Sequence, residues 1–147
     1  MKKPLARLLR VRELVEDLSR REFESRSAEK RALEAAASRQ RALGSALRNE
    51  AVDDLAQPWN AGHKTWRIKM ADAEVAGWKR GKLDALAEAA QPEIDRAHGE
   101  LMARRVERRQ VEILHAAAVQ AEERERVRQD QNRTDDWFQS RTRHRRS

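Results

Sequence analysis

Residues 5–56 contain no proline and one glycine, Gly44, and this long run limits the chain to helical folds more than any other feature. Within the run, apolar residues recur at steps of three and four, which aligns side chains along one side of a helix. The pattern predicts a helix at about residues 5–57 that packs against another helix. The stripe consists of Leu8, Val11, Val15 and Leu18 and, after a polar interruption, of Ala32, Ala36, Leu43 and Ala46.

The stretch "AQPWNAGHKT" (56–65) interrupts the pattern. Pro58 cannot continue a helix, and Gly62 gives the freedom that a turn needs, so a turn is predicted at 58–65. Thr65 can then cap a second helix, predicted over residues 66–139, before a basic tail at 140–147. The apolar positions of the second helix are Val75, Trp78, Leu83, Leu86, Ala90, Ile94, Leu101, Val106, Ile113 and Ala117.

Two long helices joined by a short turn predict an all-α fold, a single long antiparallel two-helix coiled-coil hairpin over 1–147. Facing residues should have numbers that sum to roughly 122, which places "ALEAAA" (32–37) opposite "ALAEAA" (85–90). The two alanine-rich stretches then coincide, so the backbones can approach closely. The other expected neighbours are Leu47 with Val75, Leu43 with Trp78, Leu18 with Leu101, and Val15 with Val106.

The second helix contains Pro92, which inside a helix removes a hydrogen bond and costs about 3 kcal/mol. We expect a kink near Pro92 or a break that divides the helix in two. The second helix is also the longer one, and residues from about 118 to 139 have no partner in this register. Val119, Val127, Trp137 and Phe138 therefore need a binding pocket on another molecule, because a lone helix of this length is marginal in water.

Charged residues make up 39% of the chain and aromatic residues 4%, so a compact core of large side chains is not expected. The composition also suits disorder, but strong helix formers and only three prolines favour helix. The basic start lacks an apolar signal segment, no window is apolar enough to span a membrane, and there is no cysteine. These features predict a cytoplasmic protein, and its net charge of +7 suggests an acidic partner.

Catalysis finds no support in the motifs, and we expect neither enzyme activity nor a cofactor or metal. The stretch "WKRGK" (78–82) lacks the spacing of a phosphate-binding loop, and the four histidines are scattered. Trp59, Trp66 and Trp78 lie near the predicted turn, either as an aromatic lock or with Trp66 displayed to a partner. The terminal arginines are either a solvated helix end or a nucleic-acid contact, but both predicted helices mix acidic with basic residues, so nucleic-acid binding is not the expectation.

The opening "MKKPLARLLRVRELVEDLSRREFE" and the ending "RQDQNRTDDWFQSR" resemble the two ends of the FliJ family of flagellar export proteins. The first shares a basic-Pro-Leu start and paired leucines. The second shares a glutamine-rich basic run, an acidic pair, an aromatic and a basic tail. Stalk proteins of virulence-type type III secretion systems look similar, so this resemblance leaves both systems open.

The resemblance implies a non-catalytic stalk that joins the export ATPase ring to the cytoplasmic domain of the export gate and handles export chaperones. It implies a place at the cytoplasmic face of the inner membrane, reached through partners, and a role in flagellum assembly and motility. A generic coiled-coil adaptor and a nucleic-acid-binding protein remain as alternatives. By the resemblance, the ATPase-binding residues are Leu5, Leu8, Leu9, Arg12, Arg126, Arg133, Asp135, Asp136, Trp137 and Phe138, and the gate-binding residues are Trp66, Met70, Trp78 and Leu83.

Overall fold

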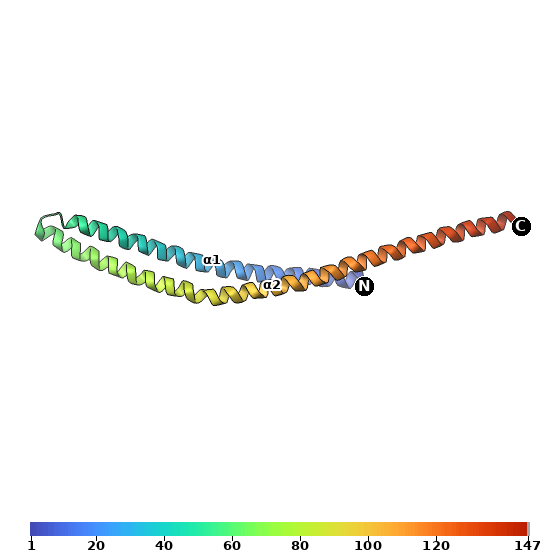
Figure 1. Cartoon of the computed structure of the whole chain (residues 1–147), viewed down its shortest axis with the longest axis horizontal. Coiled ribbons are helices and arrows are strands. Elements are labelled where there is room, and N and C mark those ends of the chain that lie inside the picture. The colour runs from blue at the N-terminus through green and yellow to red at the C-terminus, as the bar shows by residue number, and fades with distance from the viewer. Residues whose placement is uncertain (147) are drawn as a thin grey trace. The chain divides into compact units, whose positions relative to one another are not determined.

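The computed structural model describes residues 1–146, apart from the side chains of residues 60 and 61. It contains two helices, α1 (Lys2–Asp54) and α2 (Trp59–Arg146), joined by a short turn (Figure 1). The described residues contain no strand. The predicted all-helical hairpin with a longer second helix is therefore confirmed.

The helix boundaries differ from the prediction at the turn. The turn is short and lies at residues 55–58, where the amides of Ala56 and Gln57 donate hydrogen bonds to the carbonyls of Asp53 and Asp54. Pro58 directly precedes α2, which is a position that tolerates its missing N–H group, so the expected turn at 58–65 was wrong. Thr65 caps no helix start, because its hydroxyl donates to the carbonyl of Gly62 within α2.

Gly62 is required for a reason other than turn flexibility. A Cβ atom at this position would lie 2.1 Å from the carbonyl oxygen of Asp54, which is closer than any real contact. Glycine therefore allows the first turn of α2 to lie directly against the end of α1. The close approach sets where the two helices begin to run side by side.

The other two boundary predictions also need correction. Helix α2 runs without interruption through Pro92, which is exposed, so a break at this residue is wrong, and the alternative of a kink near Pro92 stays a prediction. Buried residues on both sides of it, Ala87 and Ile94, hold the helix in place through packing. The expected basic tail at 140–147 is helical as far as Arg146, and its basic last turn interacts favourably with the helix dipole.

The contacts of the chain group into two units. We call Met1–Ser19 with Leu101–Ser147 the terminal unit, and Arg20–Glu100 the tip unit. In the tip unit the ring of Phe23 lies 5.3 Å from that of His98, and Lys30 donates a 2.5 Å hydrogen bond to Gln91. In the terminal unit Arg12 pairs with Glu107. Each pair agrees with the register that the sequence predicts.

The face of α1 that packs against α2 is not the predicted one. Apart from Ile94, the buried positions in the tip unit are occupied by small residues, Ala37, Gly44 and Ala51 on α1 and Gly62, Ala73, Ala76, Ala87 and Ala97 on α2. A Cβ atom on Gly44 would lie 3.7 Å from Ala76, so the two helices are close together. The larger residues of the predicted α1 stripe, such as Leu43, point outward instead.

On α2 the prediction is partly right. Ile94 and Leu101 are buried, and Leu83 and Ala90 are half-buried. The expected seam positions Val75, Trp78, Leu86, Val106 and Ile113 are exposed. Apolar size was therefore a poor guide to the seam, because small side chains allow the closest approach of two helices.

Candidate partner-binding surface of the terminal unit

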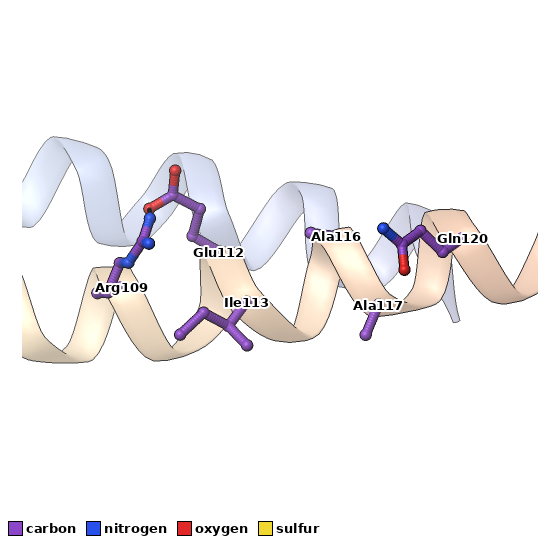
Figure 2. A pocket seen from close by; sticks show the side chains of 6 residues that line it. All are labelled: Arg109, Glu112, Ile113, Ala116, Ala117 and Gln120. Carbon is purple, nitrogen blue, oxygen red and sulfur yellow. Dashed lines mark hydrogen bonds and ion pairs between the residues drawn. The ribbon is translucent and has the colours of Figure 1, made fainter.

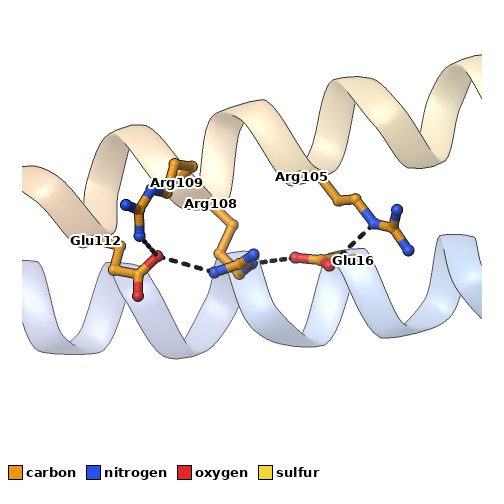
Figure 3. A network of polar contacts seen from close by, with 5 residues as sticks. All are labelled: Glu16, Arg105, Arg108, Arg109 and Glu112. Carbon is orange, nitrogen blue, oxygen red and sulfur yellow. Dashed lines mark hydrogen bonds and ion pairs between the residues drawn. The ribbon is translucent and has the colours of Figure 1, made fainter.

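The seam of the terminal unit contains charged side chains. Glu16 on α1 is only 4% exposed, and its carboxylate accepts a hydrogen bond from Nε of Arg108 on α2 (Figure 3). Nε of Arg105 lies 3.6 Å from the other carboxylate oxygen. One turn away, Nη1 of Arg12 donates a 2.8 Å hydrogen bond to Glu107. The two helices are thus joined here by ion pairs at positions that normally hold apolar residues.

The same cluster changes the proton affinity of its members. The hydrogen bond to Glu16, with the attraction of its charge, raises the pKa of Arg108 above its ordinary value. The pKa of Glu112 is lowered, first by its hydrogen bond from Arg109 and then by the charges of Arg109 and Arg108. Both shifts favour the charged forms of Arg108 and Glu112.

Large apolar side chains of the terminal unit lie outside this seam. Leu8, Val11 and Leu18 are 40%, 53% and 64% exposed, and each lies one residue before a seam position of α1. The exposed apolar residues of the unit's paired region are Leu8, Val11, Leu14 and Leu18 on α1 and Met102, Val106, Ile113 and Leu114 on α2. We call these eight residues the outer apolar set. On α2, Met102, Val106 and Ile113 share one face and Leu114 points about 100° away from Ile113, so together with the residues of α1 the set lies on more than one side of the helix pair.

Two hollows interrupt this surface. One is a shallow depression of about 370 Å³ on α2, where Ile113 and Ala117 lie on the side turned away from α1 (Figure 2). The other is an open groove of about 460 Å³ between the start of α1 and the facing part of α2. The groove is lined by Met1, Leu5, Leu114, Ala117, Ala118, Ala121 and Glu122. The groove is mostly apolar and can receive apolar side chains of a partner, whereas Arg109, Glu112 and Gln120 also line the depression.

The last part of α2 continues beyond the start of α1 (Figure 1). Every described side chain from Gln120 to Arg146 is exposed, and we call residues 120–146 the extension. Ion pairs three residues apart, such as Arg126–Glu123 and Arg133–Asp130, run along it and support an isolated helix by a few tenths of a kcal/mol each.

Trp137 and Phe138 lie near the end of the extension and are 52% and 58% exposed. Their ring centroids are 5.0 Å apart in an edge-to-face arrangement, and the guanidinium of Arg141 lies 4.6 Å from the Trp137 ring. These contacts leave much of both rings open to solvent. The prediction that they are not packed within the hairpin is confirmed.

The residues predicted to bind the ATPase do not form one surface. Leu5 lines the groove, Leu8 is exposed, and Leu9 is half-buried in the seam. Arg12 is held by Glu107 in its ion pair. The predicted residues of α2 are all exposed on the extension, namely Arg126, Arg133, Asp135, Asp136, Trp137 and Phe138. Since the extension runs past the start of α1, the two groups are separate along the molecule.

The sequence analysis missed most of the outer apolar set. The sequence does contain a signal for this surface, because the residues of the set on α1 recur at steps of three and four. That spacing was interpreted as the seam between the helices. The sequence pattern assigned no role to Leu14, Met102 or Leu114.

The four predicted gate-binding residues of the tip unit also lie apart. Trp78 is 64% exposed, with Nζ of Lys82 5.5 Å from its ring, whereas Leu83 and Met70 are half-buried. Trp66 belongs to a stack in which His63 lies between Trp59 at 4.5 Å and Trp66 at 5.8 Å. This stack fits the aromatic lock better than the displayed anchor. Trp78 is the one of the four that offers a large open surface.

Other kinds of site were sought in the described residues. They contain no group of three or more histidine, cysteine, aspartate or glutamate side chains placed to hold a metal ion. Within the same residues, neither helix has a segment apolar and long enough to cross a membrane. Comparisons of the chain with protein-family models, with curated proteins and with solved structures gave no match.

Proposed function

We propose that this chain is a non-catalytic stalk of the type III protein export apparatus of the flagellum, and that its terminal unit is held inside the export ATPase ring. The observation that carries the proposal is the arrangement of the terminal unit, with ion pairs in the seam and the outer apolar set around it. A partner that touched one side would leave the remaining apolar residues in water. A ring covers them all, and burying apolar surface stabilises a complex by about 25 cal/mol per Å².

The extension supplies a second contact for the same partner. At 1.5 Å per residue it reaches about 40 Å beyond the start of α1. Trp137 and Phe138 are the kind of side chains that dominate binding energies when a pocket encloses them. The arginines after position 140 add positive charge, which suits an acidic lining of the ring.

The flagellar assignment rests on the resemblance of the two chain ends to the FliJ family. On this proposal the tip unit contacts the cytoplasmic domain of the export gate, with Trp78 as its main contact, and the protein escorts export chaperones. It resides in the cytoplasm at the inner face of the membrane through these partners. The equivalent stalk of a virulence-type system would share the same surface.

Co-sedimentation with the cognate export ATPase, together with its rate of ATP hydrolysis, tests the proposal. We expect the protein to bind the ATPase and stimulate hydrolysis, and the double variant Trp137→Ala/Phe138→Ala to bind at least about 30-fold more weakly, as for a hot-spot pair. Trp59→Ala is the matched control, because Trp59 is also exposed but belongs to the tip unit.

Failure of the wild-type protein to bind or stimulate the ATPase at low salt would contradict the proposal. Binding to a random DNA duplex with a steep loss of affinity as salt rises would instead favour the nucleic-acid alternative.

A further inference from the structure

The start of α1 carries two stripes that could pack against α2. The stripe in use contains Leu9, Arg12, Glu16 and Ser19. The unused stripe lies one residue earlier at each step and is entirely apolar, with Leu8, Val11, Val15 and Leu18. Because each residue of a helix turns by about 100°, a rotation of α1 by that angle would exchange the two stripes without changing the axial register.

Hydrophobic burial alone favours the unused stripe. The facing part of α2 has Leu101 and Val111 buried near the two ends of the contact. In the predicted register Leu18 would meet Leu101, and Leu8 would lie opposite Leu114, about one turn from Val111. The present rotation instead leaves Leu18 64% exposed and Leu8 40% exposed. Other contacts of α1, among them those of the buried Ala37, Gly44 and Ala51 farther along the same helix, must therefore oppose this rotation.

Within the terminal unit, rotation would break the ion pair of Arg12 with Glu107 and the more deeply buried ion-pair cluster at Glu16. Its two carboxylate oxygens face Arg105 and Arg108 of α2, and it is the one charged residue among those described that is almost fully buried. Rotation would carry Glu16 away from α2. Arg108 would keep only its 3.0 Å pair with Glu112 on its own helix, and the buried ion pairs of Glu16 with Arg105 and Arg108 would be lost.

We propose that Glu16 is a positioning residue that fixes the rotation of α1 and so keeps Leu8, Val11 and Leu18 of the unused stripe exposed. In the native rotation these three residues are exposed and Val15 is half-buried. In the rotated state α2 covers the stripe. The inference concerns the hairpin itself and stands or falls independently of the export ATPase.

Thiol labelling of single-cysteine variants can test this cleanly, because the natural chain has no cysteine. Leu9→Cys reports on the seam, whereas Val11→Cys and Leu18→Cys report on the outer stripe. Each is prepared with Glu16 intact, with Glu16→Leu and with the nearly isosteric Glu16→Gln. Glu13→Leu is the matched control, because it removes an exposed carboxylate from the same helix. Far-UV circular dichroism measures helix content in every background.

With Glu16 intact, the thiols at positions 11 and 18 should react at least about tenfold faster than the thiol at position 9, since a protected site reacts through local opening. In Glu16→Leu the order should reverse while helix content is unchanged, and in Glu16→Gln the difference should shrink at least threefold. Glu13→Leu should keep the native order.

Two results would overturn the proposal. One is a native labelling order in both Glu16 variants, which would mean that another contact sets the rotation. The other is fast labelling at all three positions in a helical Glu16→Gln protein, which would mean that the helices separate instead of rotating. Should Glu16→Leu fail to fold, the Glu16→Gln series decides between these outcomes.

Discussion

Leu18 and Leu101 provide the sharpest test of where the seam lies. The apolar pattern predicts that the two leucines pack against each other, whereas in the structure one is buried and the other is exposed. Leu101 is 3% exposed and Leu18 is 64% exposed. Truncating a buried leucine to alanine costs about 2–5 kcal/mol in a full core, and the narrow seam of two helices can relax, so we expect about 2–3 kcal/mol for Leu101→Ala. For Leu18→Ala the expected change is below about 0.5 kcal/mol.

Thermal and urea unfolding, followed by circular dichroism at 222 nm, measure both variants. At about 2–4 °C per kcal/mol for a chain of this size, Leu101→Ala should lower Tm by roughly 5–10 °C and Leu18→Ala by no more than about 2 °C. Leu14→Ala is a matched control, since Leu14 is exposed to the same extent as Leu18. Equal losses for Leu18→Ala and Leu101→Ala would show that the two leucines pack together in solution and would refute the seam described above.

Three further outcomes are expected. Trp137→Ala should change the Tm of the isolated protein by less than about 2 °C, because a surface substitution on the extension removes no core contact; a larger drop would show that the ring packs within the hairpin. Gly62→Ala should destabilise the protein by about 1–3 kcal/mol in urea unfolding, because its Cβ would meet the Asp54 carbonyl at 2.1 Å; an unchanged midpoint would mean that the turn is more open. The pKa of Glu112 is lower in the folded state than its ordinary value of 4.5. The stability that the charged Glu112 contributes is therefore fully present above pH 4.5, and it is lost as the pH falls through the lower pKa of the folded state. The Tm difference between wild type and Glu112→Gln should therefore shrink on acidification below pH 4.5, and a constant difference would contradict the ion pairs with Arg108 and Arg109.

The axial arrangement of the hairpin follows from the sequence because it depends on few features. Strong helix formers fill two long segments, and one proline-containing break lies between them. Once the break is placed, chain connectivity fixes which residues are level with each other. Pairs such as Phe23 with His98 and Lys30 with Gln91 agree with that register.

The rotation of the helices does not follow from the same features. Pattern analysis places the largest apolar residues in the seam, but at Gly44, Ala73 and Ala76 close backbone approach selects small residues instead. In the terminal unit the choice depends on one buried carboxylate, Glu16, and the arginines opposite. The sequence does not reveal these partners until the three-dimensional contacts are known.

Only part of the candidate surface could be predicted from the sequence, because the position of the other part depends on the rotation of the helices. Trp137 and Phe138 could be assigned to a partner because no stretch of the first helix remained to cover them. The outer apolar set could not, since its assignment depends on the rotation. Leu8 was included among the partner-binding residues through the family resemblance, and not through its exposure.

Cysteine protection in the assembled complex tests most directly whether a ring surrounds the terminal unit. Val11→Cys on α1, and Ile113→Cys and Leu114→Cys on α2, whose side chains point about 100° apart, place single thiols on different sides of the helix pair, and Val75→Cys places one on the exposed surface of the tip unit as a control. If the ATPase encloses the stalk, labelling at the first three positions should slow at least about tenfold on binding while labelling at position 75 stays fast. Protection at one of the three with the other two still reactive would show a partner bound to a single side, and would contradict the account.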